Sequence, residues 1–150
     1  MSYPTTDDVN LHAEPPWPVP GHDTARRRKT ELPRILLVED DASTADVMQR
    51  LLTRQGYDVR SAACYKEALH TATEWFPDVL ISDIVLPEKD GFQVIKTMRA
   101  AYPGLKGIAV SGYASPEDVA RSRDAGFSEH FAKPVDIAQL TDAIRHLLVE

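Results

Sequence analysis

Cysteine is scarce in this sequence, and its scarcity limits the covalent and metal chemistry of the chain. The one cysteine among 150 residues, Cys64, cannot form an intramolecular disulfide or build a thiolate metal cluster. The five histidines show no spacing typical of a zinc site. The length is instead sufficient for one domain with a real hydrophobic core. The sequence therefore excludes a small disulfide-stapled protein and allows a reducing compartment.

Long hydrophobic runs and an excess of positive charge are also missing. No run of about eighteen apolar residues occurs, and the N-terminal MSYPTTDDVN lacks the basic-then-apolar pattern of a secretory signal. Lys and Arg number 17 against 23 Asp and Glu, and the net charge of −6 disfavours binding to phosphate backbones or anionic lipid. We therefore expect a cytoplasmic protein that binds neither nucleic acid nor membranes.

Proline is concentrated near the N-terminus. Six of the 11 prolines lie within the first 33 residues, namely Pro4, Pro15, Pro16, Pro18, Pro20 and Pro33. The stretch EPPWPVPG at 14–21 has Trp17 and Val19 as its apolar side chains, too few to offset the entropy of being ordered. We predict a disordered, proline-rich arm over residues 1–32 and a folded domain over 33–150. The arm is either a docking ligand anchored by Trp17 or a plain linker.

From Pro33 onward, short apolar runs alternate with amphipathic segments. Runs typical of buried strands occur at 35–38, 57–62, 79–81, 108–110 and 129–132. Segments with helical periodicity follow them at 42–55, 65–75, 92–102, 116–124 and 137–148. This order favours an α/β fold, with a doubly wound, five-stranded parallel sheet covered by helices on both faces.

Two of the predicted helices differ in what they can bury. The helix at 42–55 has one apolar stripe, which predicts a core-facing side formed by Val47, Met48, Leu51 and Leu52. The helix at 116–124 is rich in charge, and the small set of residues that it offers to the core is Val119, Ala120 and Ala125. We therefore expect this fourth helix to be the least firmly docked.

Polar side chains follow four of the predicted strands. The first strand ends in Glu39-Asp40-Asp41, the third in Asp83, the fourth in Ser111 and the fifth in Lys133-Pro134. Each alone has an ordinary role, as a helix cap, a turn residue or a solvated surface group. In an open parallel sheet, however, ligands bind outside the carboxyl ends of the strands. The coincidence of these groups at one edge predicts a functional site.

The residue types at this edge suit phosphoryl chemistry. Crowded carboxylates repel one another, and their charged forms become tolerable when a cation lies among them. An oxygen-rich set of this kind fits a hydrated Mg²⁺ ion best. One carboxylate can then act as a nucleophile toward a phosphoryl group, while the metal and a lysine neutralise charge on its oxygens. A serine hydroxyl can hydrogen-bond the bound phosphate.

Residues 33–150 resemble a response-regulator receiver domain of two-component signalling. Four segments carry the resemblance, in the family's order: ILLVEDD at 35–41, DIVLPEKDGFQVI at 83–95, VSGYAS at 110–115 and AGFSEHFAKPV at 125–135. The resemblance as a whole extends over the predicted domain. The resemblance implies a flavodoxin-like (βα)5 fold with strand order 2-1-3-4-5.

The resemblance also implies a role for each site residue. Asp83 is the phosphoacceptor, and Glu39 and Asp40 bind Mg²⁺, with Asp40 as the direct ligand and Glu39 acting through water. The backbone carbonyl of Val85 completes the metal shell together with Asp83. Lys133 pairs with the acceptor carboxylate or its phosphate, and the peptide bond before its neighbour Pro134 is cis.

Three further residues are assigned by the same resemblance. Asp41 is a capping or flanking acid, and Ser111 is the switch hydroxyl that follows the phosphate on activation. His130 stands three residues before Lys133, where the family more often has the tyrosine or phenylalanine that swings inward on activation. His130 is therefore either a smaller aromatic switch or a half-exposed strand residue.

The implied function is a phosphorylation-dependent signalling switch rather than an enzyme. Its phosphodonor is a phosphohistidine on a histidine kinase or a histidine phosphotransfer protein. Since the chain ends soon after the last helix, we expect no output domain. Signals then pass to a downstream protein through the face of the fourth helix, fifth strand and fifth helix, with homodimer formation also open.

The sequence is compatible with several kinds of regulator. The chain is a stand-alone regulator, a phosphate sink, or a receiver of the kind fused to hybrid histidine kinases. A Mg-dependent aspartyl-phosphate phosphatase would need a second acid two residues after Asp83, where the sequence has Val85. A receiver-like interaction module that is never phosphorylated predicts loss of an acid or of the lysine, and all are present.

Overall fold

Strands and helices alternate in the order that the apolar pattern predicts. The computed structural model describes residues 31–112 and 114–149, so most of the predicted arm at 1–32 and Tyr113 lie outside the described residues. The elements are β1 (Arg34–Val38), α1 (Ala42–Arg54), β2 (Asp58–Ala62), α2 (Tyr65–Trp75), β3 (Val79–Asp83), α3 (Gly91–Ala101), β4 (Lys106–Ser111), α4 (Pro116–Ala125), β5 (Glu129–Ala132) and α5 (Ile137–Leu148).

The five strands form one parallel sheet in the order β2-β1-β3-β4-β5, which confirms the predicted topology. Strand β3 lies at the centre, and all five of its residues are buried. In the register between β3 and β4, Asp83 lies opposite Val110, one residue before Ser111. Ser111 in turn lies opposite Ala132 of β5. The parallel arrangement therefore brings the ends of β1, β3, β4 and β5 to one edge of the sheet, as predicted.

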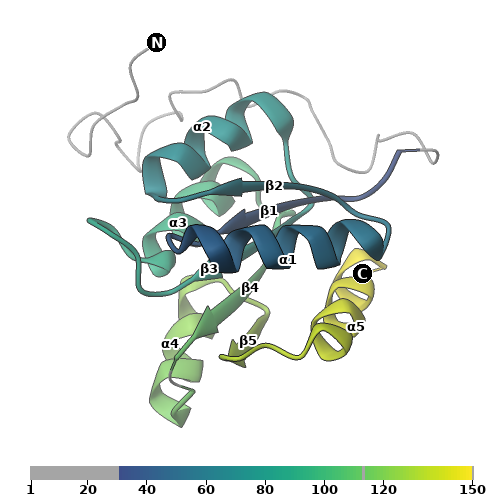
Figure 1. The fold of residues 1–150 in the computed structure, drawn as a ribbon. Coiled ribbons are helices and arrows are strands. Elements are labelled where there is room, and N and C mark those ends of the chain that lie inside the picture. The colour runs from purple at the N-terminus through teal and green to yellow at the C-terminus, as the bar shows by residue number, and fades with distance from the viewer. Residues whose placement is uncertain (1–30, 113, 150) are drawn as a thin grey trace.

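Helices cover both faces of the sheet, and the alternation of side chains along each strand decides which face a residue serves. In β1, Ile35 and Leu37 pack with α1 and α5, whereas Leu36 and Val38 pack with α2 and α3. Helix α4 adds Ala125 to the second of these cores. Figure 1 shows α1 crossing in front of the strands, with α5 beside it near the C-terminus. Strands buried on both faces explain the continuous apolar runs of the sequence.

Two expectations about helix packing were wrong in detail. In α1 the fully buried residues are Ala45 and Leu52, and Val47 is 55% exposed instead of facing the core. In α4 the buried residues are Ser122 and Ala125, while Ala120 is exposed. The other predicted residues, namely Met48, Leu51 and Leu52 of α1 and Val119 and Ala125 of α4, are buried or half-buried, so one predicted residue in each helix lies outside the core. Helix α4 is still thinly anchored, with two buried residues among its ten.

Side chains cap four of the helices at their N-termini. The carboxylate of Asp41 accepts a hydrogen bond from the backbone N–H of Thr44, which confirms the capping role expected of Asp41. Asp90, Ser115 and Asp136 cap α3, α4 and α5 in the same way. Among the described residues, none of the helices combines the length and apolar character needed to cross a membrane.

Candidate functional site

The acidic end of β1 supplies two carboxylates with different surroundings. Glu39 is 5% exposed, and its backbone N–H donates to the carbonyl of Ala62 at 3.0 Å, which extends the pairing of β1 with β2. Its side chain also accepts a hydrogen bond from the backbone N–H of Asp41 at 3.2 Å. Asp40 is exposed. One acid is thus fixed by hydrogen bonds, and its neighbour faces solvent at the edge of the sheet.

Asp83 is the last residue of β3 and is 6% exposed. The following loop closes tightly over its backbone, where the N–H of Gly91 donates to the carbonyl of Ile84 at 2.8 Å. A Cβ atom at Gly91 would lie 2.2 Å from the carbonyl oxygen of Asp83, so a side chain at Gly91 would collide with the backbone. Glycine therefore permits α3 to begin against the carboxyl end of β3, and this contact holds Asp83 in place.

Lys133 joins the two buried carboxylates. Its Nζ atom lies 3.0 Å from Oε1 of Glu39 and 2.8 Å from Oδ1 of Asp83, so it donates to both. The peptide bond between Lys133 and Pro134 is cis, as predicted. The backbone N–H of Lys133 donates to the carbonyl of Ser111 at 2.8 Å, which fixes the start of its loop against β4. The predicted lysine therefore lies within the predicted site.

These contacts shift the pKa values of the three groups in different directions. Burial, together with the adjacent Glu39 carboxylate, raises the pKa of Asp83 to about 7 in spite of Lys133. Burial also acts to raise the pKa of Glu39, but hydrogen bonds from Asp83, the Asp41 backbone and Lys133 outweigh it and lower that pKa. Burial opposes the charge of Lys133, yet its two carboxylate partners raise its pKa. Without a metal, the Asp83–Glu39 pair therefore binds a proton more tightly than a solvated aspartate does.

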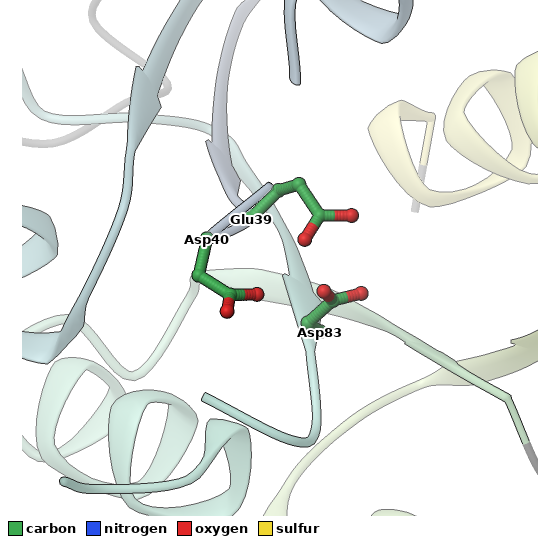
Figure 2. A group of neighbouring side chains, drawn as sticks. All are labelled: Glu39, Asp40 and Asp83. Atoms are coloured by element: carbon green, nitrogen blue, oxygen red, sulfur yellow. The ribbon is translucent and has the colours of Figure 1, made fainter. Parts of the chain in front are cut away.

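The three acids form a donor set for a divalent cation. Glu39, Asp40 and Asp83 each place a carboxylate oxygen so that all three oxygens lie within 4.8 Å of one another. Figure 2 shows these carboxylates turned toward a common space at the ends of β1 and β3. Three oxygen donors of which one is exposed suit a hard cation that keeps part of its water shell, as Mg²⁺ does. The residues present therefore fit the predicted metal.

Ser111 and His130 form a second hydrogen-bonded group beside the carboxylates. Ser111 ends β4 and is 8% exposed, and its Oγ lies 2.8 Å from Nε2 of His130. The other ring nitrogen of His130, Nδ1, lies 2.8 Å from Oγ of Ser122 in α4. His130 is half-buried in β5. The histidine therefore links β4, β5 and α4 through its ring.

Two features of the site have no clear signal in the sequence. Ser122 is 1% exposed and contacts His130, but a serine in a charged helix is unremarkable by pattern alone. An open groove of about 610 Å³ also adjoins Asp83 and Lys133, and its apolar lining includes Val47, Met48, Leu51, Val135 and Ile137. Val85 lies in the loop after β3 and is 77% exposed. The 55% exposure of Val47 was not predicted by the periodicity of the sequence.

Comparison with known proteins agrees with this geometry. The family model described as a response regulator receiver domain matches residues 35–145. An uncharacterized 14.6 kDa protein from Leptolyngbya boryana is 38% identical over 108 residues, covering 71% of this chain and 82% of that protein. Sporulation initiation phosphotransferase F of Bacillus subtilis is 29% identical over 115 residues, covering 77% of this chain and 93% of that protein.

Solved structures lead to the same family. The receiver domain protein (CheY-like) from Methanospirillum hungatei superposes with a TM-score of 0.73 at 34% sequence identity, and the match covers 77% of this chain and 93% of that one. The parallel sheet of this chain, the acids and lysine at the carboxyl ends of its strands, and the family match over most of its length agree. The chain therefore belongs to the response regulator receiver domain family of two-component signalling.

Proposed function

We propose that Asp83 accepts a phosphoryl group from a phosphohistidine of a histidine kinase or a histidine phosphotransfer protein. The observation that carries this proposal is the contact of Lys133 Nζ with the Asp83 carboxylate at 2.8 Å, beside two further carboxylates whose spacing suits a cation. A nucleophile, a cationic partner and a metal-binding acid set are thus present together. These are the parts that phosphoryl transfer to a carboxylate requires.

Phosphoryl transfer to Asp83 forms one bond to phosphorus and breaks another. An oxygen of Asp83 forms a bond to phosphorus while the bond from phosphorus to the donor imidazole nitrogen breaks, and that nitrogen keeps the electron pair. Lys133 remains within reach of the oxygens of the acceptor and orients them. Asp40, Asp83 and the backbone carbonyl of Val85 would hold Mg²⁺, with Glu39 acting through water, and the ion would supply charge neutralisation at the phosphoryl oxygens. A cation at this place would also favour the deprotonated, nucleophilic form of Asp83.

The groove beside Asp83 is the docking surface that we assign to the phosphodonor. It is lined by apolar side chains of α1 and of the segment after Lys133, and it opens directly onto the acceptor. A helix that presents a phosphohistidine from an apolar face would bury these side chains and bring its phosphoryl group to Asp83. The 55% exposure of Val47 leaves that residue available for such a contact.

The output of the switch passes through protein contacts. We assign the downstream surface to α4, β5 and α5, where the thin packing of α4 allows movement at low cost, and this face also serves if two copies associate. The proposed setting is the cytoplasm. The alternative of a Mg-dependent aspartyl-phosphate phosphatase lacks an acid two residues after Asp83. An unphosphorylated interaction module would have no use for the full set of acids and lysine.

The direct test is intact-mass measurement after incubation with a small-molecule phosphodonor and Mg²⁺. We expect one added phosphoryl group, which disappears in Asp83→Ala and on metal chelation. No adduct in the wild-type protein with any donor would refute the switch and favour the interaction module. An adduct that persists in Asp83→Ala would place the acceptor elsewhere.

A second pair of variants tests the docking surface. Val47→Asp should slow transfer from a phosphohistidine protein at least tenfold while leaving modification by the small donor unchanged, because charge would enter an apolar interface. The matched control is Leu32→Asp. Leu32 is 52% exposed and precedes β1, so it lies at the amino-terminal end of that strand, away from the site. Equal rates for Val47→Asp and the wild type would refute the assignment.

A further inference from the structure

The ring of His130 lies between two serine hydroxyls from different elements. Nε2 is 2.8 Å from Oγ of Ser111 in β4, and Nδ1 is 2.8 Å from Oγ of Ser122 in α4. Ser122 is 1% exposed, and Ser111 is 8% exposed, so neither hydroxyl is simply a solvated surface group. A continuous path of hydrogen bonds therefore runs from α4 through β5 to the residue that ends β4.

The direction of each hydrogen bond in this path follows from counting protons. The hydroxyl of Ser122 donates to the backbone carbonyl of Asp118 at 3.0 Å, and a hydroxyl has one proton to give. Ser122 must therefore accept from His130, which requires a proton on Nδ1. A neutral imidazole with Nδ1–H has a lone pair on Nε2, so Ser111 donates its own proton to His130. With a neutral ring, these three contacts are satisfied together when Nδ1 has the proton and Ser111 donates to Nε2.

We propose that Ser122 is a positioning residue that holds His130 in the Nδ1–H tautomer and thereby commits the Ser111 hydroxyl proton to His130. The inference rests on the proposed function, in which a phosphoryl group on Asp83 needs a hydrogen-bond donor. Ser111 is next to the residue that pairs with Asp83 in the register of β3 and β4. Its proton can be given to His130 or to a phosphoryl oxygen, but not to both.

This competition couples the phosphoryl group to α4. When Ser111 turns its proton to a phosphoryl oxygen, Nε2 of His130 loses its donor, and the histidine is best satisfied in the other tautomer or after rotation. Rotation breaks its contact with Ser122, and in the other tautomer Nδ1 can keep this contact only if Ser122 withdraws its proton from the carbonyl of Asp118. Either change alters the hydrogen bonding of Ser122, one of the two buried residues that hold α4. Ser122 therefore opposes phosphoryl capture in the resting protein and is released by it.

The test removes the Ser122 hydroxyl and reads the histidine directly. At pH 8, where an ordinary imidazole is neutral, ¹⁵N NMR of the unmodified wild-type protein should show a protonated Nδ1 on His130. In Ser122→Ala the proton should move to Nε2, which then donates to Ser111. The probe of phosphoryl binding is beryllofluoride with Mg²⁺, a phosphoryl mimic followed by ¹⁹F NMR. The freed Ser111 proton should tighten its binding by about threefold to tenfold, the effect expected of one hydrogen bond.

Two controls separate this effect from general loosening. Thr141→Val removes another buried helix hydroxyl, one that donates to the carbonyl four residues earlier in α5, and should change neither readout. In a Ser111→Ala background, Ser122→Ala should no longer tighten beryllofluoride binding, because no hydroxyl proton remains to be freed. The double-mutant cycle thus isolates the coupling.

The outcomes distinguish this inference from the proposed function. Protonation of Nε2 in the wild-type protein, or unchanged beryllofluoride binding in Ser122→Ala, would overturn the inference while leaving Asp83 as the acceptor. An equal gain in Thr141→Val would overturn it as well. Failure of the wild-type protein to bind beryllofluoride at all would refute the proposed function, and the tautomer measurement would then decide the proton arrangement independently.

Discussion

Replacing Asp83 by asparagine should make the metal-free protein more stable than the wild type at pH 8. This gain in stability should be much smaller at pH 5. The reason is the contact of two carboxylates at the end of the sheet, where Asp83 and Glu39 are both buried and share one ammonium partner, Lys133. Asparagine keeps the shape of the side chain and removes one of the two negative charges. The ion pair between Glu39 and Lys133 remains.

The magnitude follows from the raised pKa of Asp83, which is about 7 in the folded protein against an ordinary value of 3.8. The folded state holds the proton more tightly than the unfolded chain, so this stabilisation is complete below pH 3.8 and is lost as the pH rises through about 7. Between pH 5 and pH 8 the free energy of unfolding should therefore fall by about 2–3 kcal/mol through this group. Asparagine has no such dependence, so the advantage of the variant should widen by the same amount.

The assay is urea unfolding of both proteins with a metal chelator, at pH values from 5 to 8. Asp46→Asn is the control, because Asp46 is an exposed acid in α1 whose partner, Arg50, lies one helical turn away at 3.2 Å. Parallel profiles for the wild type and Asp83→Asn over this pH range would refute the reasoning. With saturating Mg²⁺ the advantage of Asp83→Asn should shrink at pH 8, because the wild-type site gains a cation among its acids.

Three other substitutions test the parts of the structure that hold the site. Gly91→Ala should lower the free energy of unfolding by about 1–3 kcal/mol and slow phosphoryl uptake, measured by urea unfolding and intact mass, because its Cβ would meet the Asp83 backbone. Leu80→Ala should cost about 2–5 kcal/mol in urea unfolding, since Leu80 is fully buried in the central strand. Lys133→Ala should lower the free energy of unfolding by about 1–2 kcal/mol in metal-free buffer at pH 8. This loss is smaller than that for a fully buried ion pair, because the lysine side chain is 37% exposed and solvent screens its charge.

The fold was predictable because its signals are long-range patterns rather than single contacts. Continuous apolar runs such as Ile35 to Val38 indicate strands buried on both faces, and their alternation with helical segments restricts the topology to a parallel sheet. The acids, the serine and the lysine of the site were predictable for the same reason, since each follows a strand whose end the topology places at one edge. The parallel sheet brings Asp83 and Lys133 into contact although 50 residues separate them.

What the sequence did not predict depends on the rotation of individual helices. Periodicity gives a helix an apolar side but not the angle at which that side meets the sheet. In α1, Ala45 and Leu52 are buried and Val47 stays at the surface beside the site. In α4, Ser122 is buried and contacts His130. Both features need coordinates, because serine and alanine carry little weight in a hydrophobic pattern.

Strand β5 is the element through which the proposed phosphorylation would act on the rest of the domain. It pairs with β4 at one edge of the sheet, has four residues, and has none that is fully buried. A phosphoryl group on Asp83 would attract Lys133, just beyond its end, and would draw Ser111 away from His130 within it. The two effects act at His130 within β5 and at Lys133 just after it, and α4 beside this strand has two buried residues. Since weakly packed elements move at the lowest free-energy cost, this edge should respond first to the new charge.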